Sequence, residues 1–263
     1  MKNSLLIIDP QNDFCSPEGS LFVKGAEEDC RSIKKVLENL DKKIDSIIIT
    51  MDMHHFYDIS HPGFWINAEG EKPVPYTIIT KEDLVQGIWK PANPENYNRA
   101  LDYLIKLELN KNFSCCIWPP HCLIGSPGAG INQEILDSAC KWEVDNGKPV
   151  NFVYKGSNIF TEHYSAIRAE VPDPEDRQTV TNMGVIKILK NSDRIIVCGE
   201  ALSHCVKYTV NDIIEYIPEE KLYILDDCSS PVTGFEEQGK AFLREMEERG
   251  ANIVSSDFVI ENF

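Results

Sequence analysis

Short apolar runs alternate with amphipathic segments along most of the chain, and this alternation is the main guide to its fold. The runs are rich in Leu, Ile and Val, as expected for strands buried on both faces of a sheet. They cover residues 5–8, 46–50, 149–154, 195–197, 222–225 and 252–255. Apolar positions three or four residues apart predict helices over residues 26–40, 95–109, 131–142, 160–171, 182–190, 205–214 and 235–249.

Strands and helices that alternate in this way predict a parallel sheet covered by helices on both faces. We therefore expect a three-layer α/β/α fold with a central, mostly parallel sheet of about six strands, in one domain over residues 1–263. Residues 62–117 carry prolines at positions 73, 75, 91 and 94 and little β periodicity, so we expect an insertion there. A long segment of this kind commonly serves as a lid or an interface, and the sequence leaves both open. We expect residues 11–25 to form a loop, and Thr181 to cap the helix that ends at Lys190.

Three predicted strands are followed by residues that can carry chemistry, namely Asp9, Lys155 and Cys205. The carboxyl ends of parallel strands share one edge of the sheet, where ligands bind in α/β proteins. A helix N-terminus favours a thiolate, and a carboxylate and an ammonium group nearby could move protons and stabilise charge. Each residue taken alone also fits a purely structural role. Asp9 could be a turn residue or a helix cap, Lys155 a solvated lysine at a strand end, and Cys205 a core residue packed between helix and sheet.

Two further segments contain residues that can bind a metal ion. Asp52 and His54 are two positions apart, which places both side chains on one face of an extended backbone. His121 follows two prolines that fix the backbone in front of it. Carboxylate and imidazole together suit Zn²⁺, Mn²⁺ or Fe²⁺. His55 and His61 leave the choice of ligands open.

Composition narrows the class of function. The formal net charge of −16 disfavours binding to nucleic acid or to an anionic membrane. The N-terminal apolar stretch is too short for a signal peptide or a membrane span. Nine cysteines without regular spacing indicate reduced thiols, and hence a cytoplasmic protein.

Five ordered segments resemble the successive signatures of the nicotinamidase/pyrazinamidase family, within the isochorismatase-like cysteine hydrolases. They extend over nearly the whole chain, and the resemblance is close in the motifs and loose between them. The segments are Asp9–Leu21, Asp52–His54, Trp118–Cys122, Tyr154–Gly156 with Tyr164 and Ser165, and Cys198–Val206.

The resemblance implies an isochorismatase-like hydrolase that deamidates nicotinamide to nicotinate and ammonia in NAD salvage, through a thioester on a cysteine. It also implies one divalent metal ion, with zinc as the first choice and iron or manganese as alternatives, and a cis peptide bond between Glu200 and Ala201. The implied residues are a triad of Asp9, Lys155 and Cys205, oxyanion-hole N–H groups of Ala201 and Cys205, ring contacts from Phe14 and Trp118, and metal ligands Asp52, His54 and His121.

Some features depart from the family pattern and keep other functions open. The segment before His121 is longer than in compact members, and His61 is out of register with the position where some members supply a fourth ligand. A related hydrolase of another small amide or carbamoyl compound is the main alternative. A non-enzymatic metal-binding or thiol-redox protein is a more distant one. Cys198 and Cys205 lack the Cys-x-x-Cys spacing of a redox pair, and a metal binder would need neither Lys155 nor Cys205. The sequence leaves the oligomeric state open, with a homo-oligomer as one option.

Overall fold

The computed structural model describes residues 1–110 and 114–263, and a six-stranded sheet forms its centre. The strands lie in the order β10-β9-β8-β1-β2-β7, and every adjacent pair is parallel. The predicted three-layer fold with about six strands is therefore confirmed. The bounds are β1 Asn3–Ile8, β2 Ser46–Asp52, β7 Asn151–Lys155, β8 Arg194–Gly199, β9 Leu222–Leu225 and β10 Asn252–Val254.

Strand β1 lies inside the sheet, and all six of its side chains are buried. It pairs with β2 on one side and with β8 on the other, so the strand order reverses at this point. The reversal opens a crevice at the carboxyl ends of the strands, which is where open α/β sheets bind ligands.

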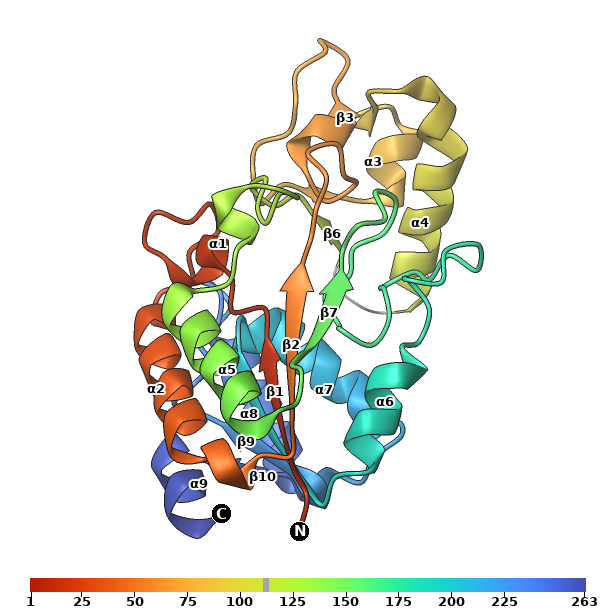
Figure 1. The fold of residues 1–263 in the computed structure, drawn as a ribbon. Coiled ribbons are helices and arrows are strands. Elements are labelled where there is room, and N and C mark those ends of the chain that lie inside the picture. Colours follow the sequence, from red (N-terminus) through yellow and green to blue (C-terminus); the bar gives the residue numbers. More distant parts are fainter. Residues whose placement is uncertain (111–113) are drawn as a thin grey trace.

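Helices cover both faces of the sheet (Figure 1). Helices α2, α5 and α9 pack together on one face, and α6, α7 and α8 lie on the other. The bounds are α1 Asn12–Cys15, α2 Ala26–Asn39, α5 Gln133–Asn146, α6 Met183–Lys190, α7 Lys207–Ile214, α8 Glu236–Glu248 and α9 Ser256–Asn262. Short helical turns cover η1 Asp41–Lys43, η4 Pro127–Ala129, η5 Leu202–Val206 and η6 Glu219–Lys221. None of the described helices is long and apolar enough to cross a membrane.

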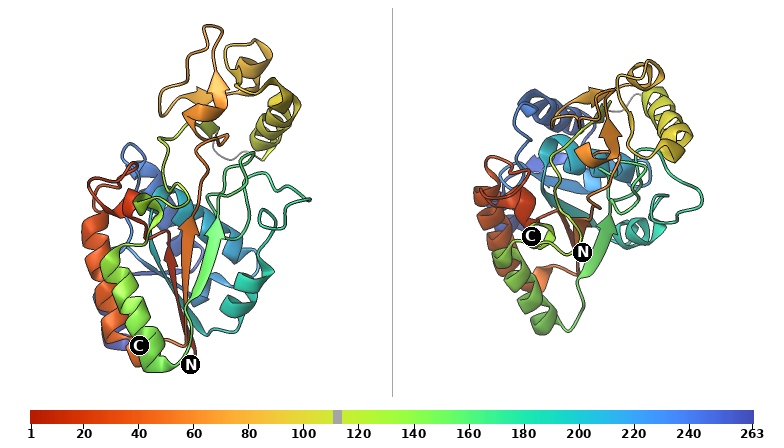
Figure 2. Two further views of the ribbon diagram at one scale, coloured as in Figure 1. Left: turned by 45° about the horizontal axis from the view of Figure 1, so that its top comes forward. Right: turned by 90° about the horizontal axis from the view of Figure 1, so that it is seen from above.

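A separate lobe, built from the elements η2 to β6, stands beyond the carboxyl ends of β2 and β7 (Figures 1 and 2). It has its own apolar cluster, in which Phe64, Trp65 and Leu104 are almost fully buried. Residues 111–113, inside the expected insertion, lie outside the described part of the chain. The elements of the lobe are η2 Pro62–Phe64, β3 Trp65–Ile66, β4 Ile78–Ile79, α3 Lys81–Val85, β5 Lys90–Pro91, η3 Pro94–Asn96, α4 Tyr97–Leu109 and β6 Cys115–Cys116.

Three local predictions are wrong. Residues 160–171 form no helix, because side chains such as the Thr161 hydroxyl bind the backbone and hold a loop instead. The cap of α6 is Asn182, whose side chain accepts a hydrogen bond from the N–H of Val185, and not Thr181. Residues 11–25 are not all loop, because helix α1 begins at Asn12.

Candidate active site and metal cluster

Asp9, Lys155 and Cys205 meet at the carboxyl edge of the sheet. The ammonium nitrogen of Lys155 lies 3.0 Å from Oδ2 of Asp9 and 3.7 Å from the sulfur of Cys205. The three residues are 0, 1 and 6 % exposed, so water screens these charges little. Asp9 directly follows β1, Lys155 is the last residue of β7, and Cys205 lies in the turn η5 after β8.

The backbone and Thr50 fix the position of Asp9. Its φ of 44° lies in the left-handed region, which turns the chain sharply at the end of β1. The hydroxyl of Thr50 donates to Oδ1 of Asp9 at 2.5 Å and accepts a hydrogen bond from the Asp9 N–H at 3.0 Å. Thr50 thus orients the carboxylate toward Lys155.

Lys155 is a buried cation that joins several groups. Besides Asp9 and Cys205, it lies 3.2 Å from Oδ1 of Asp52 and donates to the carbonyl of His163 at 2.8 Å. Burial lowers the pKa of Lys155. The negative charges of Asp52 and Asp9 raise it by more than burial lowers it, so the pKa lies well above its ordinary value. Lys155 is therefore charged across the working pH range.

Burial also shifts the two other groups of the triad toward their neutral forms. Burial raises the pKa of Asp9, and Lys155 only partly opposes this. Burial likewise raises the pKa of the Cys205 thiol well above its ordinary value, again against the effect of Lys155. Cys205 lies inside a π-helical turn rather than at the start of α7. Burial therefore opposes the thiolate that a helix N-terminus would favour, so the thiol needs a nearby base to remove its proton.

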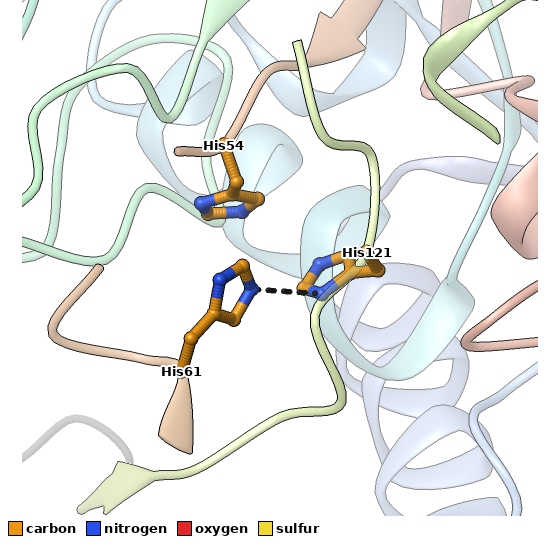
Figure 3. A group of neighbouring side chains, drawn as sticks. All are labelled: His54, His61 and His121. Carbon is orange, nitrogen blue, oxygen red and sulfur yellow. Dashed lines mark hydrogen bonds between the residues drawn. The ribbon is translucent and has the colours of Figure 1, made fainter. Parts of the chain in front are cut away.

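Three imidazoles lie next to this group. One ring nitrogen from each of His54, His61 and His121 falls within 4.8 Å of the others (Figure 3). Asp52 Oδ2 lies 3.1 Å from Nε2 of His54 and 3.6 Å from Nε2 of His121. The structure therefore brings the three expected ligands together. His61, which the sequence left open as a ligand, lies in the same cluster, with its Nε2 3.3 Å from Nδ1 of His121.

Asp58 supports this cluster from behind. Its Oδ2 lies 3.2 Å from Nδ1 of His54, while Oδ1 accepts hydrogen bonds from the N–H and hydroxyl of Ser60. Carboxylates placed in this way fix the orientation and tautomer of a metal-binding imidazole. Burial lowers the pKa of His61 to about 3, so its ring is neutral and keeps a lone pair to offer.

A narrow pocket of about 30 Å³ opens at Cys205, and aromatic rings form much of its wall. Phe14 and Trp118 both line it, as the resemblance implies for ring contacts, and the Trp118 indole N–H donates to the Tyr164 hydroxyl at 3.0 Å. A larger hollow of about 440 Å³ lies at Arg168 and Asp212, and no cysteine lines it. The smaller pocket is the better candidate because it contains the thiol, Asp52 and His121.

The expected oxyanion-hole residues also lie at this pocket. Ala201 and Cys205 both line it, and the peptide bond between Glu200 and Ala201 is cis. The carbonyl of Ala201 accepts hydrogen bonds from the N–H groups of His204 and Val206, which hold the turn closed. These two bonds fix the backbone of the turn that carries Cys205.

Three residues of the site, Thr50, Asp58 and Glu162, were not expected from the sequence, and His61 was left open as a ligand. Thr50 and Asp58 give no motif of their own, although Asp58 stands four residues after His54. Glu162 is 4 % exposed and lines the pocket, and its Oε2 has no hydrogen-bond partner among the described residues. Its position seven residues after Lys155 was the only available signal.

The chain is similar to known proteins over nearly its full length. It is 25 % identical to the nicotinamidase of Saccharomyces cerevisiae over 253 residues, which cover 95 % of this chain and 98 % of that protein. The crystal structure of the yeast nicotinamidase Pnc1p with the inhibitor nicotinaldehyde matches with a TM-score of 0.67, at 23 % identity over 96 % of this chain and 99 % of that one. The pyrazinamidase of Pyrococcus horikoshii in complex with zinc matches with a TM-score of 0.57, at 19 % identity over 97 % and 99 %. No protein-family model matches the chain.

Proposed function

We propose that this chain, a member of the nicotinamidase/pyrazinamidase family of isochorismatase-like hydrolases, deamidates nicotinamide to nicotinate and ammonia. The observation that carries the proposal is the contact of Lys155 with both Asp9 and Cys205 at the base of an aromatic pocket. A thiol, a carboxylate and an ammonium group in contact are the parts that acyl transfer from an amide requires.

The reaction begins with proton transfer from the Cys205 thiol to Asp9, whose raised pKa makes it a stronger base than an ordinary carboxylate. The thiolate sulfur forms a bond to the amide carbon of nicotinamide. Asp9 returns the proton to the nitrogen, the C–N bond breaks, and ammonia leaves. Water then attacks the thioester while Asp9 accepts one of its protons, the C–S bond breaks, and Asp9 passes that proton to the departing sulfur, which releases nicotinate and the free thiol.

Negative charge builds on the substrate oxygen in both steps. The N–H groups of Ala201 and Cys205 are our candidates for the donors that stabilise it, and Lys155 adds a positive charge nearby. Loss of one such donor typically costs about 10²–10³ in rate.

The substrate ring is placed against Phe14 and Trp118. Aromatic side chains favour a flat ring through stacked or edge contacts. The edge of the ring opposite the amide then faces the histidine cluster. The contact between Trp118 and Tyr164 holds the indole in place.

A divalent metal ion fits the donor set that this structure contains. Asp52, His54 and His121 would hold it, with His61 close enough to contribute, and their mixed oxygen and nitrogen donors suit zinc first and iron or manganese second. The Asp52 carboxylate is shared with Lys155, and His54 is backed by Asp58, so the donors are fixed in orientation. When bound, such an ion supplies a Lewis acid that can orient the pyridine ring.

All nine cysteines are free thiols, eight of them buried. Free thiols persist in reducing compartments. We therefore assign the enzyme to the cytoplasm, where it would supply nicotinate for NAD salvage.

Ammonia release from nicotinamide by the purified protein tests this function. The wild type should release ammonia and nicotinate in equal amounts, and a chelator should stop the reaction until Zn²⁺, Fe²⁺ or Mn²⁺ is added back. Cys205→Ala should give no product although it keeps the fold. Absence of ammonia from the metal-supplemented wild type would overturn the proposal.

A further inference from the structure

Two buried carboxyl groups lie behind the oxyanion turn, outside the triad. Asp29 on α2 is 6 % exposed, and Glu200, which follows β8 and precedes Ala201, is 1 % exposed. Their side chains lie close enough for a hydrogen bond between them, and the Ser230 hydroxyl is a further hydrogen-bond partner of Asp29. Oδ2 of Asp29 and Oε1 of Glu200 are buried, and no donor group of the described residues reaches either atom.

Two ionised carboxylates cannot form such a bond, because both are acceptors only and their charges repel. None of the neighbouring titratable groups supplies a positive charge to offset this repulsion. They are all acids or thiols: Glu28 and Cys30 on α2, Cys15 on α1, Cys198 on β8 and Asp227 after β9. Within the described chain, no lysine or arginine forms an ion pair with Asp29 or Glu200. The Ser230 hydroxyl can donate one proton to Asp29, so a shared proton is the remaining means of bonding the two carboxyl groups to each other.

We propose that Asp29 and Glu200 share one proton, and that this acid pair positions the oxyanion turn at Ala201. The second half of the proposal rests on the proposed function, while the shared proton does not. Glu200 touches neither the triad nor the pocket, so its role is positioning.

The remaining contacts of Glu200 tie the turn to its surroundings. Its Oε2 accepts a hydrogen bond from the Ser230 N–H at 3.3 Å, and its own N–H donates to the carbonyl of Ile8 at 2.7 Å. The carbonyl of Ser230 in turn accepts from the N–H of Leu202 at 2.9 Å. Hydrogen bonds thus fix both neighbours of Ala201, Glu200 before it and Leu202 after it. The contact between Glu200 and Asp29 links this segment to α2.

The pair should make stability depend on pH in a defined direction. Burial raises the pKa of Glu200 well above its ordinary value, and the bond to Asp29 raises it further. Burial also raises the pKa of Asp29, with partial opposition from its hydrogen bonds. The stabilisation from the bound proton is therefore complete below the ordinary carboxyl range and is lost as pH rises through the raised pKa.

Glu200→Gln separates the shared proton from other effects. Glutamine has the same shape, donates to Asp29 from its amide nitrogen and still accepts from Ser230, yet it cannot ionise. Glu247→Gln, on the exposed face of α8, is the matched control. The Tm of each metal-loaded protein should be measured from acidic to alkaline pH.

The expected result is a Tm gap between Glu200→Gln and wild type that widens as pH rises, while Glu247→Gln runs parallel to the wild type. The infrared carbonyl band of a protonated carboxylic acid should also disappear in Glu200→Gln. Parallel Tm curves for Glu200→Gln and wild type, with no change in that band, would overturn the shared proton. Neither readout needs substrate, so failure of the proposed function leaves this test intact.

Activity tests the positioning role. Glu200→Ala should lower kcat at least about tenfold with little change in KM, because oxyanion donors act on the transition state, and Glu200→Gln should restore most of the loss at neutral pH. If Glu200→Ala does not fold, Asp29→Ala serves in its place with Asp29→Asn as the conservative partner. A folded Ala variant that keeps wild-type kcat well below its Tm would overturn the positioning role.

Discussion

Lys155 and Asp52 are in direct contact, with the ammonium nitrogen 3.2 Å from Oδ1 of the carboxylate. The second oxygen of Asp52 lies 3.1 Å from Nε2 of His54. The Asp52 carboxylate therefore joins Lys155, which contacts Cys205, to the histidine cluster. The candidate catalytic residues and the candidate metal ligands form a single charge network. A substitution in one group should therefore change the electrostatics of the other.

Removal of the Lys155 charge should disrupt this network. Lys155→Gln leaves Asp9 and Asp52 buried without their cation, and breaking a buried pair in this way typically costs about 3–5 kcal/mol. We expect a large drop in Tm and loss of nicotinamide hydrolysis, whereas Lys187→Gln on the exposed face of α6 should change neither. Calorimetry and ammonia release measure the two effects. Wild-type stability in Lys155→Gln would contradict the network.

The Thr50 hydroxyl should set the acid limb of the pH profile. It donates to Oδ1 of Asp9 and so lowers the pKa of a carboxyl group that burial raises. Asp9 must be ionised to accept the thiol proton, and activity therefore falls as pH drops through its pKa. In Thr50→Val the acid limb of kcat/KM should move to higher pH.

Thr50→Ser keeps the hydroxyl and is the matched control for that shift. Its acid limb should stay close to that of the wild type. A limb that moves to lower pH in Thr50→Val, or does not move at all, would argue against Asp9 as the base.

Asp58 should govern metal affinity without binding the metal itself. Its Oδ2 lies 3.2 Å from the Nδ1 of His54, and loss of such an outer partner typically weakens metal binding by about 10–100-fold. Asp58→Ala should raise the Kd for Zn²⁺ by that factor, measured by competition with a chelator. Asp102→Asn on the exposed face of α4 should bind zinc as the wild type does. Equal affinities in all three proteins would exclude Asp58 from this role.

The strands of the sheet were predictable because they are buried on both faces and read as continuous apolar runs. The six runs identified the six strands, and the residues at their ends included Asp9 and Lys155. The two-residue ladders β3–β5 and β4–β6 were not predictable, since such short segments carry no periodicity. Helix α9 was missed because its seven residues span only about two turns.

The parts of the site that depend on contacts between distant segments could not be predicted from the sequence. His61 reaches His121 through the path of the loop between residues 55 and 61, which no spacing rule describes. The bond between Asp29 and Glu200 joins positions far apart in the sequence, and only the packing of α2 against β8 brings them together. Motif spacing finds residues on one element, whereas tertiary packing selects their partners.

During turnover Cys205 should carry the acyl group of nicotinamide, which is measured most directly by the mass of enzyme quenched with acid. We expect a nicotinoyl group on the peptide that contains Cys205, absent from Cys205→Ala and from protein quenched before substrate is added. A wild type that turns over nicotinamide without any acylated cysteine, or a Cys205→Ala variant that still releases ammonia, would contradict it.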